Sequence, residues 1–587
     1  MRHVEETTTT TTTTGASRVV EVAPPPKKHE RKGSLMSALS ETLKSISLHD
    51  ELLPLARSLA RCDAGLIDLG RDLELAPDAS PPSAAGGGGG KGTTLVQSLH
   101  RCLSRSRFKL GMYAFLVPWV GSMAVASASV AAAGVLLMPA LVLLEVGFYV
   151  HMRGKRRDLL RVDKSRPIDR EECFAHLRSI GQSLVDLSAT SPDLCSTFIS
   201  DWFNGADPRE VSRGDALQWM SQSFIFRDFE DLDSPADAAV VEEITDEMEE
   251  LLRHDRLCGP SFGFLPGGRK QECLKSGFNI CGPYEMAHYP CCVYAGIQVF
   301  KRLVGALIKN LGFEKHHIGP GEAGERGGLT YWVRDASGLG ANGKRETSPI
   351  IFFHGIGTGV SSYGVLLQAL ASAYPNSSIM VVDLPLVAME VPCSGSPSPA
   401  SSEDTLCKPL IRALLKHKFM HKRPIIMGHS FGCFACRWVL NHKTLSTAMG
   451  GCVLLDPLVF LLPYPDVSKR LQAPCDTFYE FLVRRLIMRE PSVAYALNRK
   501  SKWPKCCLWE EDLLRLKERN DGFKMGVALS RHDCFFDVPM VEAYLDKMRG
   551  PTGGWMAHKT FECTHGELVF RPDLLGETMR MVNTCMH

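Results

Sequence analysis

The stretch that decides the fold is Pro424–His442, which reads PIIMGHSFGCFACRWVLNH. Ile425 to Met427 form a short apolar run that predicts a buried strand, and the residues after Gly432 contain neither proline nor glycine and predict a helix. Gly428 and Gly432 stand two residues on either side of Ser430, and small residues at these positions permit a sharp, strained turn. Ser430 is therefore predicted at the tip of a strand–turn–helix unit.

A second match to the same G-x-S-x-G pattern, Gly259 to Gly263, shows that the pattern alone is weak. It follows a charged segment and leads into Leu265-Pro266-Gly267-Gly268, so it has neither a strand before it nor a helix after it. We expect Ser261 in a loop. Only Ser430 has the flanking elements that a reactive serine on such a turn requires.

From Gly328 onward, short apolar runs alternate with stretches of helical length, which is typical of an α/β unit with a mainly parallel sheet. The predicted strands are Leu329–Val333, Ile350–Phe353, Ile379–Val382, Ile425–Met427, Cys452–Leu455, Met525–Leu529 and Lys559–Cys563. These strands and their helical crossovers fill one domain, which we place at residues 328–587.

The strand predicted at Ile350–Phe353 leads into His354-Gly355-Ile356-Gly357-Thr358-Gly359, a flexible turn. Backbone amides in such a turn can point toward the carbonyl oxygen of a bound substrate. We expect the amides of Ile356 and Phe431 to form an oxyanion hole. A plain strand-to-loop turn is the alternative interpretation.

Three aspartates compete to be the acid that orients a catalytic histidine. Asp533 is the favoured candidate, because it follows the strand predicted at Met525–Leu529, at the sheet edge where open α/β sheets collect their reactive groups. Asp456 and Asp537 are the alternatives, since chain order permits all three. A turn or helix cap before Pro457 would also explain Asp456.

His565 is the candidate general base. It follows the last predicted strand, and Gly566 beside it frees the loop to reach the serine across the sheet edge. The resulting order along the chain is Ser430, Asp533, His565. This order is expected for an α/β-hydrolase and differs from both common protease orders.

The chain resembles the lipase and esterase branch of the α/β-hydrolase superfamily through HGIGTG at His354, GHSFG at Ser430, SRHD ending at Asp533 and THGE at His565. It looks most like membrane-anchored members whose substrates are not assigned. The resemblance implies Ser430 as nucleophile, Asp533 as acid and His565 as base. Because the oxyanion loop reads HGIGTG rather than HGGG, substrate classes tied to HGGG are not inherited.

Residues 457–522 form an insertion between two predicted strands and combine apolar residues, such as Leu461, Phe478 and Phe481, with basic ones. An insertion that leaves the carboxyl end of a strand begins beside the site. We interpret it as a helical cap whose apolar side chains suit acyl chains. An ordinary packed helical insertion is the alternative.

Residues 1–107 are predicted to hold no large domain. Residues 1–33 are Thr-rich and then Pro- and Lys-rich, which is typical of a disordered tail. Short helices are expected over 34–76, followed by a flexible linker at the glycine run Gly86–Gly90. The N-terminus has no apolar core of a signal peptide, so no cleaved targeting signal is expected.

Residues 108–152 are predicted to form a membrane-embedded helical hairpin. From Leu110 to Val150 the only charged residue is Glu145, and one straight helix of that length would be about twice as long as the hydrocarbon core is thick. Two helices that turn near Ser127–Ser129 fit better. Basic residues flank both ends, which places the hydrolase domain on the cytosolic side. An apolar hairpin inside a soluble core is the alternative.

Residues 153–327 are predicted to be a mainly helical region that does not indicate a function. One helix around Val240 to Leu251 is acidic and amphipathic. Another, Val293 to Leu311, has one apolar face beside Lys301, Arg302 and Lys309. That stripe fits a membrane surface and core packing equally well.

Composition argues against several functional classes. Hydrophobic residues make up 44% and charged residues 22%, as in globular proteins, and the net charge of +2 gives no support for nucleic-acid binding. The 20 cysteines are scattered, which favours a reducing compartment. Cys433 and Cys436 form a CxxC, but no second pair lies at zinc-site spacing, so no metal and no cofactor are expected.

We therefore expect a membrane-associated serine hydrolase that cleaves a carboxylic ester of a lipid or other hydrophobic substrate through an acyl-enzyme. Two alternatives stay open: an acyltransferase that uses the same three residues with an alcohol in place of water, and a non-catalytic membrane scaffold that kept the fold. The sequence names neither the substrate-binding residues nor a protein partner.

Overall fold

The computed structural model describes residues 137–160, 169–274, 284–319, 328–336, 347–391, 402–549 and 554–586. The chain divides into two compact units, Met1–Gly89 and Gly90–His587, and every described residue belongs to the second. The predicted tail, the helices expected at 34–76, the glycine linker and the predicted hairpin up to residue 136 lie outside the described residues.

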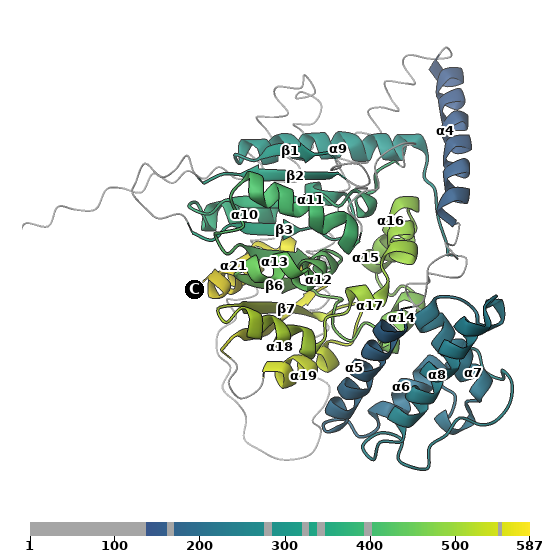
Figure 1. Cartoon of the computed structure of the whole chain (residues 1–587). Coiled ribbons are helices and arrows are strands. Elements are labelled where there is room, and N and C mark those ends of the chain that lie inside the picture. Colours follow the sequence, from purple (N-terminus) through teal and green to yellow (C-terminus); the bar gives the residue numbers. More distant parts are fainter. Residues whose placement is uncertain are drawn as a thin grey trace, which may run out of the picture. The chain divides into compact units, whose positions relative to one another are not determined.

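Eight strands form one sheet in the order β1-β2-β4-β3-β5-β6-β7-β8 (Figure 1). β2 runs antiparallel to both of its neighbours, and all other pairs are parallel. The strands are β1 (Glu314–Ile318), β2 (Leu329–Arg334), β3 (Ile350–Phe353), β4 (Ile379–Val382), β5 (Ile425–His429), β6 (Gly451–Leu455), β7 (Lys524–His532) and β8 (Met556–Thr564). The mainly parallel sheet expected from the sequence is present.

β1 is the one strand of this sheet that the apolar runs do not predict. Its sequence, Glu-Lys-His-His-Ile, is polar, and it pairs only with β2 at the edge of the sheet. Edge strands keep polar side chains because they face water and must not pair with other chains. A prediction that depends on apolar runs therefore misses this strand.

Side chains on the central strands alternate between two hydrophobic clusters, as the two-residue period of a strand requires. On β3, Ile351 and Phe353 belong to the larger cluster, and Ile350 and Phe352 to the smaller. The smaller cluster includes side chains of α10 (Gly364–Ala373) and α21 (Pro572–Met586). The larger includes α11 (Glu403–Lys416), α12 (Gly432–Asn441) and α19 (Val538–Arg549).

The turn between β5 and α12 is packed too closely for side chains at its two glycines. A Cβ on Gly432 would collide with the carbonyl oxygen of Phe353 at the end of β3. A Cβ on Gly428 would lie 2.7 Å from the Gly432 carbonyl oxygen. Both positions therefore require glycine for space, and α12 begins directly against the sheet.

The segment between β6 and β7 is helical, at the position predicted for the cap. Its regular elements are α14 (Pro465–Gln472), α15 (Phe478–Glu480), α16 (Pro491–Tyr495), α17 (Trp503–Cys506) and α18 (Glu510–Arg519), and π-helical turns extend α15 and α16. We keep the name cap for residues 457–522. Phe478 and Phe481 form a stacked aromatic pair on its surface, with ring centroids 6.3 Å apart.

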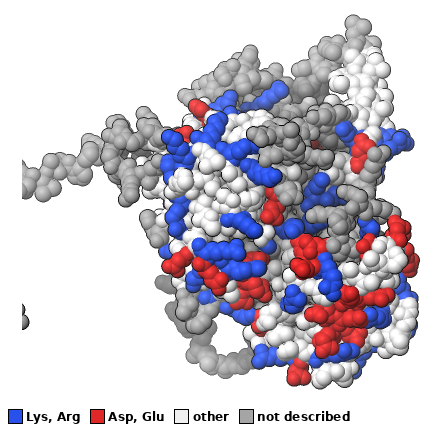
Figure 2. All heavy atoms as spheres, viewed as in Figure 1, with Lys and Arg blue, Asp and Glu red and all other residues white. Residues whose placement is uncertain are grey.

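Four helices before the sheet form a helical region: α5 (Arg170–Ser188), α6 (Leu194–Trp202), α7 (Arg213–Met220) and α8 (Pro235–Leu252). Their buried side chains belong to the same cluster as those of the cap. Trp509 Nε1 donates to His176 Nδ1 of α5 at 3.0 Å, and Trp503 Nε1 donates to the Ser223 carbonyl at 2.7 Å. The helical region is thus packed against the cap, and acidic residues gather on the opposite, exposed side of α8 (Figure 2).

α4 (Leu137–Leu160) carries the described part of the predicted membrane hairpin. It exposes apolar side chains, among them Leu143 at 72% and Val150 at 63% exposure, and its surface is largely uncharged in Figure 2. The helix continues beyond residue 152, where the hairpin was expected to end, through the basic run 153–157. Glu145 accepts a hydrogen bond from the Cys291 amide at 2.8 Å. Glu145, the only charged residue from Leu110 to Val150, therefore caps the start of a long helix further along the chain.

The helix that Glu145 caps is α9 (Cys291–Asn310). Within the described residues it is the one helix long and apolar enough to cross a membrane, with a mean hydropathy of 1.5. Its buried side chains are Tyr294, Ile297 and Ile308, so Ile297 is the one member of the predicted Val293–Leu311 stripe that is buried. Val293 of the stripe is partly buried against the larger hydrophobic cluster, and Val304 and Leu311 are partly buried against the smaller one, so this face of the helix packs against the protein.

Replacing Gly432 with alanine is expected to lower the free energy of unfolding by about 1–3 kcal/mol, because α12 must move away from β3 to admit a methyl group. Gly576→Ala is the matched control. Gly576 lies inside α21 with open space around its Cα, so a methyl group is expected to leave stability unchanged or raise it by roughly 0.5–1 kcal/mol. Denaturant unfolding of both variants measures this, and equal midpoints for the two would contradict the packing described here.

Candidate active site

Ser430 occupies the turn that follows β5. Its φ of +52° lies in the left-handed region, which residues with a side chain seldom adopt. The Ser430 amide donates to the Leu455 carbonyl at the end of β6, at 2.9 Å, so the neighbouring strand holds the strained turn in place. The side chain is 4% exposed. The turn therefore presents Ser430 beyond the sheet edge, inside the protein.

The structure brings Ser430, His565 and Asp533 together. His565 Nε2 lies 2.9 Å from Ser430 Oγ, and His565 Nδ1 lies 2.6 Å from Asp533 Oδ2. The other oxygen of Asp533 accepts the Phe535 amide at 2.8 Å, and the Phe535 ring packs edge-on against the imidazole. The three residues follow β5, β7 and β8, whose carboxyl ends meet at one edge of the sheet.

The charges around His565 favour its protonated form. Burial acts to lower the pKa of His565, but the negative charge and the hydrogen bond of Asp533 outweigh it, so the pKa is raised above its usual value. Asp456 adds to this effect. A histidine that takes a proton from Ser430 Oγ would be stabilised in its charged form at this position.

The loop after β3 carries one of the two amides predicted to form an oxyanion hole. The Gly355 amide donates to Tyr363 Oη and the Gly357 amide to the Val387 carbonyl, at 2.7 and 3.0 Å. Between them, the Ile356 amide has no hydrogen-bond partner among the described residues, and the same holds for the Phe431 amide. Both residues line the cavity beside Ser430. The two predicted amides are thus without a backbone acceptor among the described residues.

Two buried histidines, His354 and His429, contact the groups around the loop after β3. His354 is fully buried; its Nε2 accepts the Leu384 amide at 2.8 Å, so Nδ1 carries the proton and donates to the Gly355 carbonyl. His429 Nδ1 lies 2.7 Å from the hydroxyl of Tyr363, which also accepts the Gly355 amide. Burial lowers the pKa of His429, so it is neutral at physiological pH. Both imidazole rings therefore help to stabilise the loop after β3.

Asp456 lies beside His565 without taking the position of Asp533. Its Oδ2 accepts the Gly566 amide at 2.7 Å, directly after His565, and lies 3.7 Å from His429 Nε2. Burial acts to raise the pKa of this carboxyl, but His429, His565 and the Gly566 amide outweigh it and lower the pKa. Asp456 therefore fixes the histidine loop, a role that the sequence did not reveal beyond its place after β6.

The other candidates lie elsewhere. Asp537 Oδ1 accepts the Met540 amide at 2.9 Å at the start of α19, so it serves as a helix cap. Ser261 lies exposed in a turn, as expected for the second G-x-S-x-G match. Asp456, Asp533 and His565 place three possible metal-ligand atoms within 4.8 Å of one another among the described residues. Two of these groups already share the 2.6 Å hydrogen bond.

A small cavity, here called the catalytic cavity, borders Ser430. It has about 20 Å³ of free space, room for roughly one water molecule. Side chains of the cap close it, and the lining residues are Ile356, Ser430, Phe431, Phe434, Leu458, Val467, Leu471, Met488, Leu497 and Phe535. Apart from Ser430 they are all apolar. The sequence indicated an apolar cap but could not indicate which of its side chains face the serine.

Comparison with known proteins supports the fold. Residues 350–551 match the sequence model of the Alpha/beta hydrolase family, which supports a hydrolase. The described sheet and its helices have the α/β-hydrolase fold, with a mixed and mostly parallel sheet. A search of curated proteins finds no match.

Several solved structures are similar to part of the chain. The Pyrococcus furiosus esterase Pf2001 is 13% identical and has a TM-score of 0.31, with 48% of this chain and 96% of that chain covered. A putative aryl esterase from Burkholderia cenocepacia is 14% identical, with a TM-score of 0.31 and coverages of 46% and 99%. A bacterial membrane phospholipase A is 16% identical, with a TM-score of 0.32 and coverages of 50% and 95%.

The rate at which a fluorophosphonate modifies Ser430 is expected to fall as pH drops, because protonated His565 cannot take the serine proton. The midpoint should lie above the usual histidine pKa, since Asp533 raises the pKa of His565. Asp533→Asn removes that charge, so the midpoint should move to lower pH and the maximal rate should fall on the order of 10³–10⁴-fold. Rapid-mixing measurement of the modification rate against pH tests both effects.

Asp537→Asn is the matched control for this experiment, since it makes the same change four residues along the chain at a helix cap. It should leave the pH midpoint in place and change stability little, because asparagine caps a helix about as well as aspartate does. An unchanged midpoint in Asp533→Asn, or an equal shift in Asp537→Asn, would show that Asp533 does not set the pKa of His565.

Proposed function

We propose that this protein is a membrane-associated serine hydrolase that cleaves a carboxylic ester of a lipid or other hydrophobic substrate through an acyl-enzyme. The observation that carries the proposal is the hydrogen-bonded triad of Ser430, His565 and Asp533. Ser430 Oγ lies 2.9 Å from His565 Nε2, and His565 Nδ1 lies 2.6 Å from Asp533 Oδ2. Backbone strain and buried polar groups both cost stability. A non-catalytic scaffold would gain nothing from this triad at a strained turn.

In the proposed reaction, Ser430 Oγ attacks the ester carbonyl carbon while His565 Nε2 takes the serine proton. The Ile356 and Phe431 amides donate to the oxygen that becomes negative. His565 then gives its proton to the leaving alcohol, which departs and leaves an acyl group on Ser430. A water molecule attacks this acyl-enzyme, with its proton passing to His565 and then to Ser430, and the carboxylic acid is released.

The lining of the catalytic cavity supports a hydrophobic acyl group. Its walls are apolar, and the cap residues Val467, Leu471, Met488 and Leu497 close it. A pocket of this kind binds hydrocarbon through burial of apolar surface rather than through charge. Because the free space is about 20 Å³, the cap must move to admit an ester.

The exposed apolar face of α4 supports attachment to a membrane. A row of exposed leucine and valine side chains of this kind has no reason to face water on a globular surface. The basic residues Arg153, Lys155, Arg156 and Arg157 follow it in the same helix, and basic residues favour the cytosolic side of a membrane. We therefore place the hydrolase domain at the cytosolic surface.

Fluorophosphonate labelling of membranes that contain the full chain tests the reaction. Wild type and Ser261→Ala should be labelled, and mass spectrometry should find the probe on Ser430 alone. Ser430→Ala should lose labelling and ester hydrolysis by orders of magnitude while its thermal unfolding stays close to that of wild type. Labelling that survives in Ser430→Ala, or wild type that is folded and unreactive, would refute the proposed nucleophile.

Vesicle flotation tests the membrane attachment. Lysine at both Leu143 and Leu144, which are 72% and 57% exposed on α4, should lower the bound fraction at least about tenfold, because each lysine costs roughly 2.5–3.5 kcal/mol at the centre of a membrane helix. Leu514→Lys, at a 44% exposed leucine of α18, is the control and should bind like wild type. Equal binding of all three proteins would argue against α4 as the attachment site.

A further inference from the structure

A second cavity, here called the aromatic cavity, lies between the helical region and the cap. It is lined by Ile180, Phe198, Trp202, Trp219, Met220, Ser223, Phe224, Met248, Leu462, Pro463, Val467, Ser468 and Trp503. Its free space is about 30 Å³. The residues come from all four helices of the helical region, the turn after α7, and the cap. None of them carries a charge.

Val467 lines both cavities and so separates them. It lies on α14 and is 4% exposed. Leu471, one helical turn further, faces the catalytic cavity, and Ser468 faces the aromatic one. α14 is therefore the wall between the space at Ser430 and the space inside the helical region.

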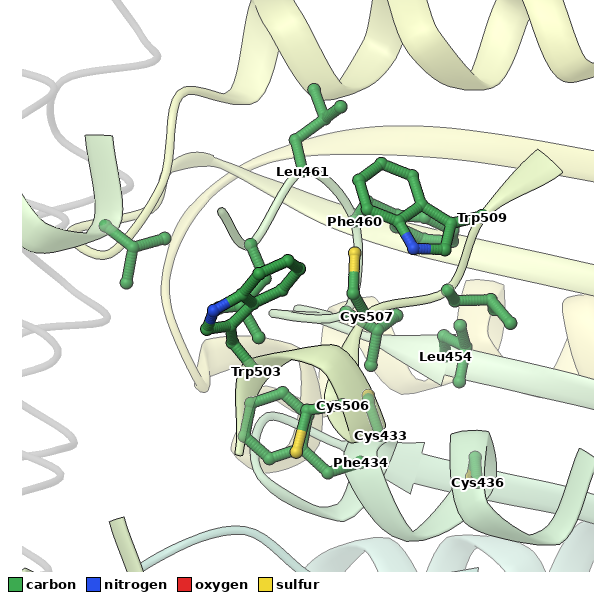
Figure 3. Packing of buried hydrophobic residues seen from close by; sticks show 14 of the residues in the cluster. Cys433, Phe434, Cys436, Leu454, Phe460, Leu461, Trp503, Cys506, Cys507 and Trp509 are labelled. Atoms are coloured by element: carbon green, nitrogen blue, oxygen red, sulfur yellow. The ribbon is translucent and has the colours of Figure 1, made fainter. Parts of the chain in front are cut away.

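The wall and its surroundings form one continuous apolar environment. Trp503 of the aromatic cavity and Phe434 of the catalytic cavity belong to the same hydrophobic cluster, and Figure 3 shows both among its side chains. Around the aromatic cavity, ring centroids of Trp202 and Trp219 lie 5.9 Å apart, and those of Phe224 and Trp503 lie 5.4 Å apart. A hydrocarbon chain that extends from Ser430 past Val467 would stay in apolar surroundings throughout.

Two residues that line the aromatic cavity carry indole donors without an acceptor among the described residues. The indole N–H groups of Trp202 and Trp219 are buried and have no hydrogen-bond acceptor among the described residues. A buried N–H without an acceptor costs about 1–3 kcal/mol. Trp503, in contrast, donates to the Ser223 carbonyl. A ligand that carries an oxygen atom could accept hydrogen bonds from these two indole N–H groups, whereas a pure hydrocarbon could not.

We propose that the aromatic cavity binds the distal part of a long acyl chain of the substrate, and that the Trp202 and Trp219 indoles hydrogen-bond an oxygen atom on that part. The inference rests on the proposed ester hydrolysis at Ser430. It gives the helical region a function in substrate selection, with Val467 limiting how far a chain extends from the catalytic cavity.

Chain-length selectivity tests the role of Val467. The substrates are p-nitrophenyl butyrate, octanoate, dodecanoate and hexadecanoate, assayed with the full chain in membranes. Val467→Phe should lower kcat/KM for the two longest esters by at least about tenfold relative to butyrate, because a larger side chain closes the passage. Val467→Ala should favour the longest ester. Val541→Ala, at a valine of similar burial that lines neither cavity, should keep the wild-type profile.

The outcomes separate this inference from the proposed function. Ser430-dependent hydrolysis of butyrate with the same length profile in all variants would overturn the inference and leave the hydrolase intact. A parallel loss for every ester in Val467→Phe would also overturn it, since that result means damage at the serine itself. Absence of any Ser430-dependent hydrolysis would overturn both.

Esters of monohydroxylated hexadecanoic acids, with the hydroxyl at successive carbons, test the indole donors. At least one of the hydroxylated esters should be hydrolysed with a higher kcat/KM than the unmodified hexadecanoate ester. The double variant Trp202→Phe, Trp219→Phe should lose that preference while it keeps hydrolysis of butyrate. Trp332→Phe, in the other hydrophobic cluster, is the control. No favoured position, or a preference that survives in the double variant, would overturn the role of the indoles.

Discussion

The close approach of α12 to β3 is the constraint on which the rest of the site depends. The backbone at Gly432 lies against the carbonyl of Phe353. Because of this contact, the chain has no room for a wide turn between β5 and α12. The turn must therefore be sharp, which places Ser430 in the left-handed region and projects its side chain away from the sheet. The same contact brings the end of β3, and hence Ile356, to the serine. One close contact thus helps to position both Ser430 and Ile356, which line the same cavity.

Burial makes the polar groups around Ser430 depend on one another. Two carboxylates lie beside His565 and accept different hydrogen bonds. Asp533 accepts the imidazole N–H, and Asp456 accepts the backbone amide of Gly566. In a region of low dielectric, each charge is tolerated only where donors surround it. The histidine loop is consequently held at two points, by its ring and by its backbone. A loop held at one point could swing away from the serine.

The sequence predicted the parts of this protein that depend on local pattern. Seven strands were readable because buried central strands are short apolar runs, whereas β1 was not, because an edge strand with the sequence EKHHI has no such run. Ser430, Asp533 and His565 were found from their places after strands, and the structure brings them together. Chain order could not separate Asp533 from Asp456, since both follow strands and only the register of the loops decides which one meets the imidazole. The two cavities were beyond prediction, because Val467 and Trp219 meet only through tertiary packing.

Glu145 links α4 to the rest of the chain in a way that affects how the protein would meet its substrate. Its carboxylate holds the first amide of α9, and on the same helix Tyr294 donates to Glu490, which caps α16 of the cap. α4 is therefore connected to the cap by two hydrogen bonds and one helix. For a protein attached in this way, the relevant substrate concentration is the mole fraction in the bilayer, and dilution of the bulk solution would not change it. Encounter becomes a search in two dimensions, in which lateral diffusion replaces diffusion through water.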